Sequence, residues 1–140
     1  MAKIIAFNKP FGVICQFSGK GNTLANYINI KSIYPVGRLD KDSEGLVILT
    51  DDGNLQNKIS NSKNNKTKTY IIQVEGEITE EAINKLKAGV RLKDGLTKPA
   101  FIKKIQEPEW LWNRTPPVRK RKFIPTSWAE ISITEGRNRQ

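Results

Sequence analysis

The chain has 140 residues, of which 24 are basic and 14 acidic, so its formal net charge is +10. This length fits one domain with a single core, and the absence of histidine excludes histidine-based nucleophile pairs, metal sites and proton shuttles. The single cysteine, Cys15, excludes an internal disulfide, and the sequence contains no membrane-spanning apolar run and no secretory signal, so we expect a cytoplasmic protein without membrane contact.

The first half of the chain alternates apolar runs with turn residues. The run 46–50 has the length of a strand and no polar alternation, which predicts a central strand covered on both faces. Thr23 is expected to cap one short helix, and Asp51 or Asp52 to cap another. The predicted elements are strands at 3–7, 13–17 and 46–50, and helices at 23–28 and 55–60.

The second half has a helix with clear signals at both ends. Thr79 is followed by two glutamates and the helix closes with lysines before Gly89, as the helix dipole favours. The other predicted elements are strands at 69–74, 100–105 and 127–134. Residues 107–125 contain four prolines and form the one long stretch without a convincing element. The chain is thus predicted to be an α+β domain, with short helices packed on a largely antiparallel sheet.

Basic residues gather in two stretches that contain no acid and would attract a polyanion such as RNA. Their members are Lys58, Lys63, Lys66 and Lys68, and then Arg114, Arg119, Lys120, Arg121 and Lys122. Ordinary solvated surface is the alternative explanation. The tryptophans at 110, 112 and 128 could stack on bases or belong to the core.

One carboxylate stands out because Asp40 follows Gly37, Arg38 and Leu39 in a turn-rich segment that leads into an apolar strand. An acid beside a guanidinium on a tight loop is suited to catalysis. Taken alone, the same residue would be assigned to capping a turn. Residues 40–51 also partly mimic a calcium loop, although the final ligand is Asp51 in place of glutamate and residue 48 offers no side-chain oxygen.

Four strings span nearly the whole chain: NKPFGV at 8–13, GRLDKDSEGLVILTDDG at 37–53, KTY at 68–70 and EGRNRQ at 135–140. In this order they resemble the successive motifs of pseudouridine synthases. Their sequences are most similar to those of the ribosomal branch, which isomerises uridine in rRNA. The tryptophan-rich stretch 110–128 is similar to large-subunit members. The resemblance implies the pseudouridine synthase catalytic fold, an isomerase, rRNA as partner, and a reaction that requires neither a metal nor another cofactor.

The resemblance also implies roles for individual residues. Asp40 would be the essential catalytic group, Arg137 would pair with it and orient it, and Tyr70 would stack on the target uracil and help to remove its C5 proton. Taken alone, Tyr70 would be a core aromatic and Arg137 one more phosphate ligand. The residues expected to contact RNA are Lys9, Arg38, Lys68, Arg119, Lys120 and Arg121.

The carboxylate could attack the developing oxocarbenium-like sugar or take a ribose proton, and the sequence does not choose between these routes. In either route the target nucleotide must first be flipped out of its helix. We expect residues 1–140 to form a single catalytic domain, monomeric, ending inside the last motif and lacking a separate N-terminal RNA-binding domain. A non-catalytic RNA-binding protein with the same fold and basic surface is the second hypothesis.

Overall fold

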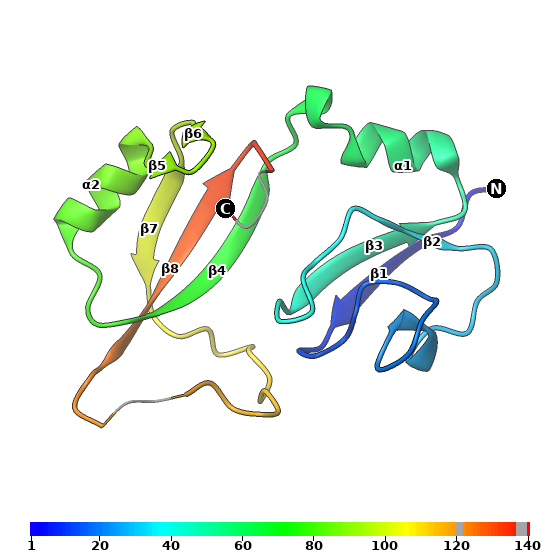
Figure 1. Ribbon diagram of the computed structural model, residues 1–140, viewed down its shortest axis with the longest axis horizontal. Helices are drawn as coiled ribbons and strands as arrows, with labels where there is room; N and C mark the ends of the chain where they lie inside the picture. The colour runs from blue at the N-terminus through cyan, green and yellow to red at the C-terminus, as the bar shows by residue number, and fades with distance from the viewer. Residues whose placement is uncertain (120–121, 137–139) are drawn as a thin grey trace. The chain divides into compact units, whose positions relative to one another are not determined.

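The computed structural model describes residues 1–119, 122–136 and 140, which fall into two compact units, Met1–Asn64 and Asn65–Gln140. Each unit has its own antiparallel sheet and its own apolar cluster (Figure 1). The predicted α+β class with antiparallel pairing and short helices is confirmed. No helix within the described ranges is long and apolar enough to cross a membrane.

The first unit is built on a three-stranded sheet in which β3 lies between β1 and β2 (Figure 1). Both neighbours run antiparallel to β3, and Leu49 lies opposite Ile5 on one side and Pro35 on the other. The elements of this unit are β1 (Ile4–Lys9), the 3-10 helix η1 (Leu24–Asn26), β2 (Tyr34–Val36), β3 (Gly45–Thr50), α1 (Gly53–Ser60) and the 3-10 helix η2 (Ser62–Asn64).

The core of the first unit forms because alternate residues of β3 face opposite sides of the sheet. Val47 and Leu49 are buried, and they join side chains from the segment that connects β1 with β2, including Val13 and Leu24. Leu46 points the other way and is 64% exposed. The run 46–50 is therefore a central strand as predicted. The predicted cover on both faces is found at the half-buried Ile48 and at Thr50, which is 1% exposed, but not at Leu46.

The segment 13–17 was predicted to be a strand and is not one. Its only ladder contact among the described residues is an isolated bridge between Ile14 and Thr23. The chain then turns, with Gly19 and Gly21 at φ values of 98° and 97°, and the Gln16 side-chain amide donates to the Ser18 carbonyl at 2.9 Å. Backbone angles of this kind are open to glycine and break an extended run, which apolar character alone does not reveal.

Both predicted helix caps of the first unit are present. The Thr23 hydroxyl accepts a hydrogen bond from the backbone amide of Ala25 at 3.3 Å and starts η1. Asp52, and not Asp51, caps α1, since its carboxylate accepts from the amides of Asn54 and Leu55 at 2.9 and 3.2 Å. These side chains satisfy amides that a helix leaves without partners in its first turn.

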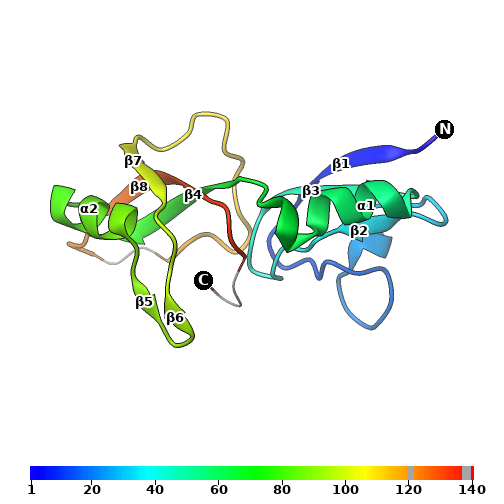
Figure 2. The ribbon, with the colours of Figure 1, turned by 90° about the horizontal axis from the view of Figure 1, so that it is seen from above.

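The second unit has β8 in the middle of its sheet, paired with β4 on one side and β7 on the other. α2 packs beside β7, and the hairpin of β5 and β6 extends away from the sheet (Figures 1 and 2). The elements are β4 (Lys68–Glu75), α2 (Glu80–Ala88), β5 (Arg91–Leu92), β6 (Gly95–Leu96), β7 (Phe101–Ile105) and β8 (Thr126–Ile133).

The core of the second unit lies between the sheet and α2. Ile83 of α2 packs with Ile102 and Ala129 of the two neighbouring strands, and all three are at most 5% exposed. Between β7 and β8 the described residues form no helix or strand, as the prolines predicted. The three shortest strands, β2, β5 and β6, were not predicted, because two or three residues carry no readable alternation.

Candidate active site

Asp40 lies in the loop 37–44, which joins the antiparallel strands β2 and β3. The loop opens at Gly37, whose φ of 71° is a left-handed value that glycine adopts without strain. The Asp40 carbonyl accepts a hydrogen bond from the Ser43 amide at 3.0 Å, which closes a turn around the following two residues. Arg38 and Asp40 are both exposed, so this turn presents a guanidinium and a carboxylate to solvent.

The residues on either side of Asp40 are anchored. Leu39, between the two exposed charged residues, packs against the apolar cluster of the first unit. The Lys41 carbonyl accepts hydrogen bonds from the Gly12 amide at 2.8 Å and from Lys9 Nζ at 3.3 Å. Because one neighbour packs on the core and the other is hydrogen-bonded to residues about 30 positions earlier in the chain, the backbone of Asp40 is held in place while its side chain remains accessible.

Lys9, which was expected to contact RNA, is fully buried, with a relative exposure of 0%. It is the last residue of β1 and lies on the core side of the strand, after Ile5 and Phe7 at alternate positions. Its Nζ donates to the carbonyls of Pro10 at 3.0 Å and Val13 at 2.9 Å as well as to that of Lys41. This burial corrects the expectation, because the ammonium group faces the protein and not the solvent.

Burial also lowers the pKa of Lys9 from its ordinary value of 10.5, because the charged form loses its hydration. Electrostatic interactions with Cys15 and with the carboxylates of Glu44, Asp42 and Asp40 oppose this shift. The acidic loop and the buried ammonium thus attract each other through space, in addition to the hydrogen bond at the Lys41 carbonyl. Lys9 therefore holds the Asp40 loop from the core side, by a hydrogen bond to the Lys41 carbonyl and by attraction to the carboxylates.

In the second unit, Lys68 and Tyr70 lie on β4 two residues apart, so they project from the same face of the sheet. Tyr70 is directly opposite Ile131, which belongs to the core cluster, and is 40% exposed. The exposed Lys68 places its Nζ 3.7 Å from the position of a Cβ on Gly136. The ring of Tyr70 thus extends the apolar face of the sheet to its accessible end.

The loop between β7 and β8 carries exposed aromatic and basic side chains. Trp110 and Trp112 are 73% and 45% exposed, so neither belongs to the core, whereas Trp128 lies half-buried on β8. Arg119 is exposed and Arg114 donates to the Pro116 carbonyl at 2.7 Å. The remaining predicted site residues, Lys120, Arg121 and Arg137, lie outside the described residues.

The observed secondary structure excludes a calcium-binding loop at residues 40–51. Residues Gly45–Thr50 are strand β3, fully paired with β1, and cannot wrap around an ion. Nor do three or more His, Cys, Asp or Glu side chains come together as a metal site anywhere in the described parts of the chain.

A family model described as RNA pseudouridylate synthase matches residues 3–140. The chain belongs to this family. The resemblance of the four strings to pseudouridine synthase motifs is thereby confirmed over nearly the full sequence. A solved crystal structure of a pseudouridylate synthase superposes with a TM-score of 0.77 at 25% identity, covering 99% of this chain and 54% of that one.

Relatives named as pseudouridine synthases for the large ribosomal subunit are similar in sequence to this chain over nearly its whole length. The ribosomal large subunit pseudouridine synthase E of Vibrio vulnificus (strain CMCP6) is 55% identical over 140 residues, which cover 99% of this chain and 59% of that protein. The protein of the same name from Xanthomonas axonopodis pv. citri is 45% identical and is covered to 74% of its length. The chain thus spans between about half and three quarters of these relatives.

The sequence pattern indicated Asp40 but not what holds it. A signal for the Leu39 anchor was present, since an apolar residue between two charged ones suggests an alternation of buried and exposed side chains. The anchor at Lys41 had no signal, because it is a backbone carbonyl bonded by residues far away in sequence. The core-side position of Lys9 could have been inferred from its spacing after Ile5 and Phe7.

Proposed function

We propose that this protein isomerises a uridine of large-subunit ribosomal RNA to pseudouridine, with Asp40 as the catalytic carboxylate. The observation that carries the proposal is the Asp40 loop: an accessible acid whose two neighbours are anchored, within a chain 55% identical to a synthase named for this reaction. A fixed backbone keeps a carboxylate in one position relative to a bound sugar, which favours reaction over mere binding.

The reaction breaks the bond between uracil N1 and ribose C1′ and forms one between C5 and C1′; C5 then gives up its proton and N1 takes one up, so the product is an isomer of the substrate. The carboxylate of Asp40 either bonds to C1′ as the base departs or removes the proton from C2′, and both routes leave the base free to turn. No electron pair leaves the substrate, since the C1′ carbon receives back from C5 the bond that it lost to N1.

A uracil inside a helix is out of reach of any side chain, so the target nucleotide must be flipped out at a cost of a few kcal/mol. The exposed cations offset this cost by holding the RNA backbone, and those in the described residues include Arg38, Lys68 and Arg119. Tyr70 supplies a partly exposed ring for the extruded base. Arg137, from the EGR string, is assigned to pairing with the carboxylate.

The decisive experiment compares Asp40→Asn with Asp42→Asn, an equally exposed acid of the same loop. We expect Asp40→Asn to lower pseudouridine formation on large-subunit rRNA by about a thousandfold or more, because amide cannot replace carboxylate in either route. Its affinity for RNA should stay within about threefold of the wild type, since the loss lies in the transition state. Pseudouridine is counted by carbodiimide labelling and primer extension.

Asp42→Asn should retain its activity, which separates the chemistry of residue 40 from the general charge of the loop. Equal turnover by Asp40→Asn and the wild type would remove Asp40 from the mechanism. A wild-type protein that binds RNA tightly but modifies none of the rRNA would instead support the RNA-binding hypothesis.

A further inference from the structure

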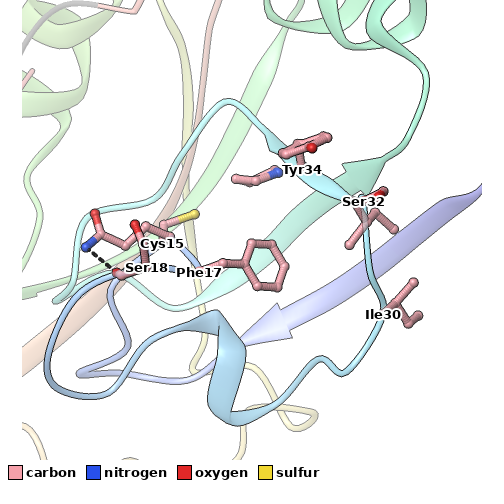
Figure 3. A pocket seen from close by; sticks show the side chains of 9 residues that line it. Cys15, Phe17, Ser18, Ile30, Ser32 and Tyr34 are labelled. Atoms are coloured by element: carbon pink, nitrogen blue, oxygen red, sulfur yellow. Dashed lines mark hydrogen bonds between the residues drawn. The ribbon is translucent and has the colours of Figure 1, made fainter.

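A second accessible feature of the first unit is an open pocket of about 470 Å³, formed by the ends of the segment between β1 and β2. Figure 3 shows Phe17 projecting toward the space that Ile30, Ser32 and Tyr34 border, with the sulfur of Cys15 at one end. This volume lies in the range of small-ligand sites, which are about 300–1,000 Å³. Neither the catalytic proposal nor any of the four motif strings makes use of it.

The walls of the pocket suit a flat aromatic group. Phe17 packs against the apolar cluster of its unit and so forms a fixed surface, whereas Tyr34 is 57% exposed and stands at the opening. A base can stack on such rings whatever its identity, because every base has an aromatic face. The hydroxyls of Ser32 and Tyr34 make no hydrogen bond to any described residue, so both can bond the polar edge of a base.

The positive charge around the pocket favours a nucleotide over other aromatic ligands. Residues 14–36, which include the whole lining, contain Lys20 and Lys31 and no acid. Both lysines are exposed. A segment with two cations and no anion attracts a phosphate backbone and has no partner for a basic peptide. The pocket therefore fits a nucleotide better than it fits an aromatic side chain from a protein partner.

We propose that this pocket binds an unpaired base of the RNA substrate, a few nucleotides away from the uridine that reaches Asp40. The inference rests on the proposed function for the identity of the RNA. Asp40 follows Tyr34 by six positions, so the Cα atoms of the two residues are at most about 20 Å apart. One RNA strand can cover that span, and a second bound base would fix which nucleotide faces the carboxylate.

The first test measures the affinity of variants in the Asp40→Asn background for a fluorescent single-stranded RNA of about ten nucleotides at fixed salt. Loss of one stacking ring in Tyr34→Ala should weaken binding by about tenfold, and Tyr34→Phe should stay within about twofold. Tyr27→Ala is the matched control, since Tyr27 is 48% exposed in the same unit but does not line the pocket. Wild-type affinity in Tyr34→Ala would overturn the proposal.

The second test does not depend on the folding of any variant. RNA carrying 4-thiouridine at single positions is crosslinked to the unaltered protein, which is then digested with trypsin. The expected adduct lies on the peptide 32–38, which contains Tyr34, and arises from a position other than the modified uridine. Crosslinks that never involve residues 15–35 would overturn the proposal.

Three further outcomes separate this proposal from others. If Tyr34→Ala abolishes self-association of the RNA-free protein in sedimentation, the pocket binds a second copy and the inference is wrong. If RNA binds and crosslinks as expected but no pseudouridine forms, the proposed function fails while the base pocket stands. A protein that binds no RNA at all rejects both.

Discussion

Lys9 shows how one side chain can organise a loop without reaching its surface. The ammonium donates hydrogen bonds to three backbone carbonyls from two separate segments, which take the place of hydrogen bonds to water. It also interacts electrostatically with three carboxylates of the loop that carries Asp40. A buried charge is costly unless hydrogen bonds satisfy it, and here all three N–H donors have acceptors. The position therefore demands a long donor and tolerates no apolar replacement.

Replacing Lys9 with methionine keeps the length of the side chain and removes its donors. The Lys41 carbonyl retains the Gly12 amide, but the carbonyls of Pro10 and Val13 lose their bonds to Nζ. We expect the free energy of unfolding to fall by about 2–4 kcal/mol, measured by urea titration, because buried acceptors are costly to leave unsatisfied. Lys3→Met, at an exposed residue, should change stability by less than about 0.5 kcal/mol. Equal losses in both variants would contradict this account.

The lowered pKa of Lys9 makes part of the stability depend on pH in a defined direction. Between the lowered value in the folded protein and the ordinary value of 10.5, the unfolded chain binds more protons at this residue than the folded chain does. The contribution of Lys9 to the free energy of unfolding therefore rises with pH across that interval, and this gain is absent at pH values below the interval. Urea titrations at several pH values up to 10.5 should show wild-type stability rising relative to that of Lys9→Met. A constant difference would contradict the lowered pKa.

At the scale of elements, Gly89 determines how α2 meets the hairpin of β5 and β6. Its φ is 106°, and a Cβ at this position would lie 2.5 Å from the Thr97 carbonyl oxygen. The Thr97 hydroxyl also accepts a hydrogen bond from the Val90 amide at 2.8 Å, so Thr97 is tied to the end of the helix. The end of α2 and the hairpin are thus packed too closely for any side chain between them.

Gly89→Ala should lower the melting temperature far more than Gly76→Ala. Gly76 also has a positive φ, 81°, but a Cβ there meets nothing within 4 Å. Gly76→Ala is therefore destabilised only by backbone strain, by about 1 kcal/mol. We expect a loss of more than about 2 kcal/mol for Gly89→Ala, because the Thr97 backbone must move as well. Calorimetry of the two variants side by side measures the difference. Similar melting temperatures would show that the contact is loose.

Elements with local signals were predictable, and those that depend on distant partners were not. The capping residue Thr79, the acids after it and Gly89 sufficed to place α2. The segment 13–17 has the same apolar character as a strand, but its backbone is bonded to a turn and not to a neighbouring strand. For the site, Asp40 carried a sequence signal, whereas its support from Lys9 and Gly12 exists only once β1 and β3 are paired.

For the whole molecule, positive charge is present in both units. The first unit contains 8 basic and 5 acidic residues, and the second contains 16 and 9. Since the chain has no histidine, this excess hardly changes near neutral pH. The positive charge proposed to attract RNA is thus shared by both units and not confined to one patch.

The central place of β8 has a consequence for a cut in the loop that precedes it. Phe123 is 91% exposed, so chymotrypsin should cleave there or at Trp110 before it reaches residues held in strands. The released C-terminal piece would carry β8, which is paired along eight positions with β4 and five with β7. We expect the two fragments to elute together in native gel filtration and to separate only in denaturant.

Early loss of the small fragment under native conditions would contradict this expectation. If the fragments stay together, covalent continuity between β7 and β8 is dispensable for the assembled sheet. The loop would then tolerate breaks, insertions or a new sequence without loss of the sheet that carries it.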